Sequence, residues 1–143
     1  MDYKRFGTKI LVRLDKGEEI IESLRRLCRE ADIRLATISG VGALDHVSVG
    51  LFEQTTQRYQ TKEFSGSMEI TSLSGNVTQM KGEVYLHLHI VLTDASYVAF
   101  GGHLNMGRIG ATAELVIDLI DGQVDRERDE AVGLNLIKLS ADE

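Results

Sequence analysis

Three histidines lie close together in the second half of the chain, at His87, His89 and His103. The first two belong to residues 84–92, where apolar side chains alternate with others, and such alternation is typical of a strand. Alternate residues of a strand share one face, so both imidazoles are expected on the same side, roughly 6.6 Å apart along the backbone. Two imidazoles at this spacing suit a common metal ion, which each binds at about 2.0–2.1 Å.

His103 is the candidate third ligand, because it follows two glycines that let the backbone turn and bring it over the strand. Neutral imidazoles suit zinc, and three of them leave a fourth position for water, a carboxylate or a small molecule. The sequence therefore predicts a zinc site, one per chain, formed by His87, His89 and His103. The alternative is a half-buried pair on a sheet face with His103 in a loop. The fourth histidine, His46, is interpreted as a surface residue in a turn.

The composition is that of one globular domain. The chain has 143 residues, of which 43% are apolar and 27% charged. Its single cysteine, Cys28, excludes an internal disulfide and a cysteine-based zinc site, and its place among apolar residues predicts a buried thiol. The sequence has no run of about 18 apolar residues and no apolar leader at its start. These features predict a soluble, cytoplasmic protein.

Hydrophobic periodicity predicts the elements that must position the histidines. A first strand is expected over residues 6–15 and an amphipathic helix over residues 17–32, with Asp15 or a near neighbour as its N-cap. Glycines separate the strands expected after it, at residues 35–39, 47–54, 68–77, 84–92, 98–100, 111–119 and 134–139. The charged residues 123–130 are expected as a short surface helix or loop. We therefore predict an α+β fold, a largely antiparallel twisted sheet with one main helix packed on it, in a single domain over residues 1–143.

Five short motifs in this chain resemble the plant-and-prokaryote conserved (PPC) domain family, and they occur in the family's order. They are Ser-Gly-Val-Gly-Ala-Leu at 39–44, Met-Glu-Ile-Thr-Ser-Leu-Ser-Gly-Asn at 68–76, His-Leu-His at 87–89, Gly-Gly-His-Leu at 101–104 and Ala-Glu-Leu at 113–115. The resemblance implies a stand-alone prokaryotic member that assembles as a homotrimer. It also implies that His87, His89 and His103 hold a metal, zinc by expectation, and that the protein has a DNA-associated or regulatory role.

The charge argues against tight DNA binding. The formal net charge is −6, from 16 basic and 22 acidic residues, whereas sequence-independent DNA binders gain most of their affinity by neutralising phosphates. In plants the PPC domain is joined to AT-hook segments with an Arg-Gly-Arg-Pro core, and this chain contains no proline. We therefore expect weak binding to duplex DNA, with a dissociation constant above the micromolar range at physiological salt.

Two other functions remain open. The histidine pattern is also similar to that of acetolactate decarboxylase, which implies a zinc enzyme acting on small carboxylated metabolites. The other alternative is a structural trimer whose metal only stabilises the fold. Glu69 and Glu114 each interrupt an apolar stretch, so they are candidates for a metal ligand, a proton donor or a carboxylate that orients a histidine. The alternative for both is a paired charge on the second sheet face or at a subunit interface. No catalytic residue is predicted.

Overall fold

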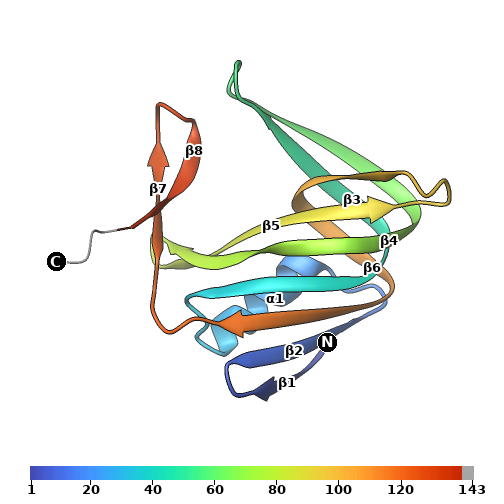
Figure 1. Ribbon diagram of the computed structural model, residues 1–143, viewed down its shortest axis with the longest axis horizontal. Helices are drawn as coiled ribbons and strands as arrows, with labels where there is room; N and C mark the ends of the chain where they lie inside the picture. The colour runs from blue at the N-terminus through green and yellow to red at the C-terminus, as the bar shows by residue number, and fades with distance from the viewer. Residues whose placement is uncertain (140–143) are drawn as a thin grey trace.

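The computed structural model describes residues 1–139 and confirms the predicted α+β class, a largely antiparallel sheet with one helix packed on it (Figure 1). The helix is α1 (Ile20–Glu30). The strands of the described part are β1 (Asp2–Phe6), β2 (Lys9–Asp15), β3 (Ala36–Glu53), β4 (Arg58–Met80), β5 (Glu83–Thr93), β6 (Ala99–Leu119), β7 (Asp125–Asp129) and β8 (Leu134–Lys138). The order across the sheet is β1-β2-β6-β3-β4-β7-β8, and β5 pairs with β4 and β6.

Four long strands at the centre of the fold form a closed cycle of pairings. β3 pairs with β4 and β6, and β5 pairs with the same two strands, all antiparallel. Each of the four contributes almost fully buried side chains to the core, among them Val47, Leu73, Ile90 and Leu104. On one side β2 extends the sheet by pairing with β6, with Lys9 opposite Asp118. The far ends of β3 and β4 continue as a hairpin that projects from the rest of the molecule (Figure 1).

The helix starts where a glutamate caps it. The Glu19 carboxylate accepts the amide protons of Ile21 and Glu22, and it also accepts that of Gly107 at 2.8 Å, which ties the helix to β6. The N-cap is therefore Glu19 and not Asp15. The predicted apolar face is confirmed by the buried side chains of Ile20, Leu24, Leu27 and Cys28. In the described part of the chain, no helix has the length and apolar character needed to cross a membrane.

Glycines make the strands look shorter in the sequence than they are. The sequence predicts separate strands over residues 35–39 and 47–54, but β3 runs through both. Gly42, with φ at 154°, lies at a register shift of β3, and a Cβ there would stand 2.6 Å from backbone and side-chain atoms of Ala113. This glycine therefore bends the strand and permits a close approach to β6, instead of ending the strand.

Two other expectations about the elements are wrong. The sequence predicts one strand over residues 6–15, whereas β1 and β2 form a hairpin that turns at Gly7. Residues 123–130 contain β7 and not a helix or an unstructured loop. β7 pairs with β8, and one of its residues pairs with β4. Mixed charges conceal this strand in the sequence, because most of its side chains face solvent.

Candidate metal centre

The alternation along β5 places its two histidines as predicted. Leu88, Ile90 and Leu92 are fully buried on the core side of the strand. His87 is half-buried and His89 is exposed, both on the opposite side. The ring centroids of the two histidines are 5.2 Å apart.

His103 lies on a strand and not in a glycine-flanked loop, so that expectation is wrong. It belongs to β6, directly opposite His89 in the antiparallel register of β5 and β6. Gly101, two positions before His103, still has a clear role, because a Cβ at this position would stand 1.9 Å from the Ile90 carbonyl oxygen. The glycine lets β6 come close to β5, and this approach brings the third imidazole to the other two.

The three imidazoles converge on one place. His103 has its ring centroid 5.3 Å from that of His87 and 5.4 Å from that of His89, so the rings form a nearly equilateral triangle. One ring nitrogen of each histidine lies within 4.8 Å of the other two, an arrangement that fits a metal ion. Three imidazole nitrogens are a donor set that suits a transition-metal ion such as zinc.

The surroundings favour the neutral form of two of these rings. Burial lowers the pKa of His87 to about 4, with further lowering by the positive charge of Arg126 and by the neighbouring histidines. Burial also lowers the pKa of His103, as does the proximity of His89. Because only a neutral imidazole has a free lone pair, His87 and His103 are ready to bind a metal at neutral pH without first losing a proton.

Arg126, on β7, lies against this triad. Its guanidinium donates to Thr78 Oγ1 at 2.8 Å, to Asn76 Oδ1 at 3.0 Å and to the Asn135 carbonyl oxygen at 2.9 Å. Its Nη2 atom also comes within 3.5 Å of His87 Nδ1. The arginine therefore connects β4, β5 and the β7–β8 hairpin beside the histidines.

A tyrosine lies on another side of the triad. The Tyr59 ring, on β4, meets the His103 ring edge to face with centroids 6.1 Å apart, and its hydroxyl donates to Asn105 Oδ1. The ring passes over Gly50, where a Cβ would stand 1.7 Å from the tyrosine oxygen. Sequence reasoning missed both Tyr59 and Arg126, because each occurs in a polar stretch that is typical of solvated surface.

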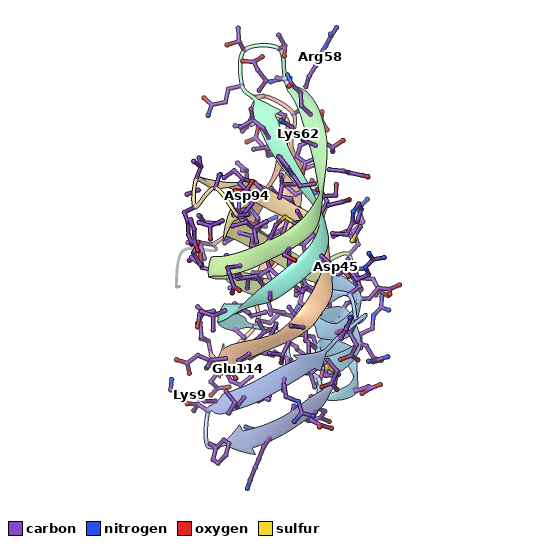
Figure 2. The ribbon with its side chains drawn as sticks, turned by 90° about the vertical axis from the view of Figure 1, so that its right-hand side faces the viewer. Lys9, Asp45, Arg58, Lys62, Asp94 and Glu114 are labelled. Atoms are coloured by element: carbon purple, nitrogen blue, oxygen red, sulfur yellow. The ribbon has the colours of Figure 1, made fainter. Side chains whose placement is uncertain are left out.

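The other candidates of the sequence analysis lie outside the triad. Glu69 is exposed on β4 and lines a separate cavity of about 540 Å³ with Lys16, Asp94 and others. Glu114 is exposed on β6, opposite Arg13 of β2, in the lower part of the sheet (Figure 2). Neither carboxylate belongs to the cluster of possible metal ligands in the described part of the chain.

His46 and Cys28 have other surroundings. His46 is not in a turn but on β3, where its Nδ1 lies 2.8 Å from Ser65 Oγ and its Nε2 lies 3.7 Å from a Glu63 oxygen. Cys28 is buried on the helix, as predicted, and burial raises the pKa of its thiol to about 12. A thiol that stays protonated is a poor nucleophile and a poor ligand, which confirms its interpretation as a packing residue.

The comparisons with known proteins concern the family and the fold. The family model of the Plants and Prokaryotes Conserved (PCC) domain matches residues 1–121. A "putative DNA-binding protein" of Bacteroides thetaiotaomicron has the same fold, with a TM-score of 0.93 and 33% identity, and 96% of each chain is covered. A metal-containing protein of Archaeoglobus fulgidus gives a TM-score of 0.83 and 31% identity, over 95% of this chain and 97% of that one.

A curated relative is much longer. The bifunctional protein GlmU of a Synechococcus strain is 32% identical over 125 residues, which cover 85% of this chain and 18% of that protein. The chain therefore spans less than a fifth of the length of this relative.

Proposed function

Because the chain belongs to the Plants and Prokaryotes Conserved domain family, we propose that it is a homotrimeric metal-binding module in which His87, His89 and His103 hold one zinc ion. The observation that carries the proposal is the convergence of the three imidazoles. A relative at 31% identity, the metal-containing protein of Archaeoglobus fulgidus, supports it. When bound, the ion supplies a Lewis-acidic centre with one position open to water or a small ligand.

Elemental analysis of protein purified without an affinity tag tests the proposal. We expect about one zinc ion per chain, because three neutral imidazoles and an open position suit zinc better than magnesium or calcium. Stoichiometric magnesium or calcium without zinc would contradict the choice of ion. Absence of any divalent metal, even after incubation with excess zinc, would contradict metal binding. It would support the alternative, in which the histidines are only polar residues on a sheet face.

The occupant of the fourth position separates a structural from a ligand-binding role. A closed set of four protein ligands is typical of structural zinc, whereas an exchangeable position is typical of catalysis or ligand binding. Within residues 1–139 the cluster offers three ligands, and His89 faces solvent. We therefore propose that the fourth position takes an exchangeable small ligand.

A trimer is the proposed assembly, and the exposed side of the sheet supports it. Leu11, Val41 and Val91 point away from the core and have 50%, 53% and 42% of their surface exposed. Burial of these side chains against another copy of the chain would remove apolar surface from water. Light scattering of the purified protein should give about three times the chain mass of 15.8 kDa. A monodisperse monomer at micromolar concentration would contradict this part of the proposal.

A DNA-associated role is suggested by one relative and opposed by the charge of this chain. It comes from the name of the Bacteroides thetaiotaomicron relative, while this chain carries a net charge of −6 and has no AT-hook. We propose a regulatory module that acts mainly through its ligand and its assembly, with weak affinity for duplex DNA.

A further inference from the structure

Arg126 carries a positive charge that is nearly buried, with only 8% of the residue exposed. Its hydrogen bonds end on the neutral oxygens of Thr78, Asn76 and Asn135, and none of the ion pairs found within residues 1–139 includes it. The Tyr85 ring, 4.8 Å from the guanidinium carbon, adds a cation–π contact but no formal charge. Because burial of a charge without a counter-ion is costly, this place favours an anion.

The contact with His87 places the guanidinium next to the candidate metal centre. Nη2 of Arg126 lies 3.5 Å from His87 Nδ1, and a guanidinium offers only donors. The guanidinium therefore lies directly beside the place where the three imidazoles converge.

A divalent ion held by the three imidazoles and a guanidinium this close to His87 repel each other unless an anion lies between them. We propose that the three-histidine centre binds a small oxyanion, with one oxygen on the metal ion and another held by Arg126. This inference rests on the metal-binding function proposed above. Carboxylates and phosphates share the required chemistry, because both present several oxygens with delocalised negative charge to the planar N–H fork of arginine.

Two features of the structure bear on such a ligand, the access of solvent to the triad and the source of the arginine. His89 is exposed, so the triad opens to solvent on the outer side of β5. Arg126 lies beyond residues 1–121, the part that the family model matches, so membership in the family does not supply this residue. The β7–β8 hairpin brings the guanidinium to the triad through its contacts with Thr78 and Asn76 on β4.

Cobalt(II) provides a direct readout, because the visible spectrum of a cobalt–imidazole centre changes when an anion joins the metal. The experiment titrates the cobalt-loaded protein with acetate, oxalate and inorganic phosphate in separate arms. We expect saturable spectral changes in the wild type and at least about tenfold weaker binding in Arg126→Gln, the loss typical of a charge-assisted hydrogen bond. A preference for the carboxylates or for phosphate then identifies the class of oxyanion.

Two variants separate this role from a purely structural one. Asn76→Asp keeps Arg126 and its packing but places a carboxylate at the atom that accepts from Nη2, so it should compete with the oxyanion and weaken binding to a similar extent. Arg108→Gln is the matched control. It removes one arginine of β6 that is exposed and paired with Asp45, and it should leave oxyanion affinity unchanged.

The cobalt content of each variant distinguishes the two proposals. Arg126→Gln should bind cobalt at least as tightly as the wild type, because it removes a positive charge near the ion. Normal cobalt binding with equal oxyanion affinity in the wild type, Arg126→Gln and Asn76→Asp would overturn this inference and leave the metal-binding function intact. Absence of cobalt from the wild type would overturn both.

Discussion

Replacement of His89 by alanine is expected to reduce bound zinc from about one ion per chain to less than about a tenth of that amount. His89 is one of three converging imidazoles, and loss of a ligand should weaken metal affinity by more than the roughly 10- to 100-fold caused by loss of a residue that only supports a ligand. The side chain is exposed on β5, so its removal leaves no cavity in the core. Elemental analysis after dialysis against metal-free buffer measures the effect.

His46→Ala is the matched control for this experiment. It removes the histidine that lies outside the triad, on β3 beside Ser65, and zinc content should stay at the wild-type level. The wild type should also melt at a higher temperature with zinc than without it, whereas His89→Ala should show no such shift, because a metal stabilises only the state that binds it. Full zinc occupancy in a His87→Ala/His89→Ala double variant would contradict the assignment.

The second large effect is expected at Gly75, which pairs with Leu88 on the strand that carries the histidines. A Cβ at Gly75 would stand 1.9 Å from the His87 carbonyl oxygen and 2.8 Å from the Leu88 Cα, and neither backbone atom can move away alone. Gly75→Ala must therefore force β4 and β5 apart. We expect it to lower the free energy of unfolding by about 4 kcal/mol or more, in the range that marks severe strain.

Urea denaturation followed by circular dichroism measures this loss. Ser74→Ala is the control, because it introduces the same side chain at the neighbouring position of β4, where the residue is exposed. Its effect should stay within about 0.5 kcal/mol, as for most surface substitutions. A Gly75→Ala variant within 1 kcal/mol of the wild type would show that the two strands can separate without cost.

The sequence predicts the local part of the site well. The alternation of residues 84–92 is visible without a structure, and it correctly assigns Leu88, Ile90 and Leu92 to the core and the two histidines to the other side. The helix is predicted for the same reason, since an apolar stripe needs only the spacing of neighbouring residues. Both inferences depend on periodicity within one element.

The parts that sequence reasoning missed depend on contacts between distant segments. The residues before His103 look like a turn because glycine permits one, but here glycine is needed for the approach of β6 to the Ile90 carbonyl. Arg126 occurs in a run of charged residues, so the sequence suggests that it is exposed to solvent. In the structure it is buried against Thr78 and Asn76, which lie 48 and 50 positions away in the chain. Composition and local spacing cannot identify such distant partners.

The pairing of β2 with β6 has a consequence for the newly synthesised chain. Lys9 and Asp118 are 109 positions apart, so β2 cannot find its partner until most of the chain has been made. At about 5–20 residues per second, the ribosome needs roughly 5–20 s to deliver that partner. During this time β2 has only β1 beside it, and Ile10, Val12 and Leu14, which are buried in the finished fold, lack the cover of β6. The N-terminal hairpin therefore exposes an unpaired strand edge and apolar side chains until β6 is made, which is a condition that favours aggregation.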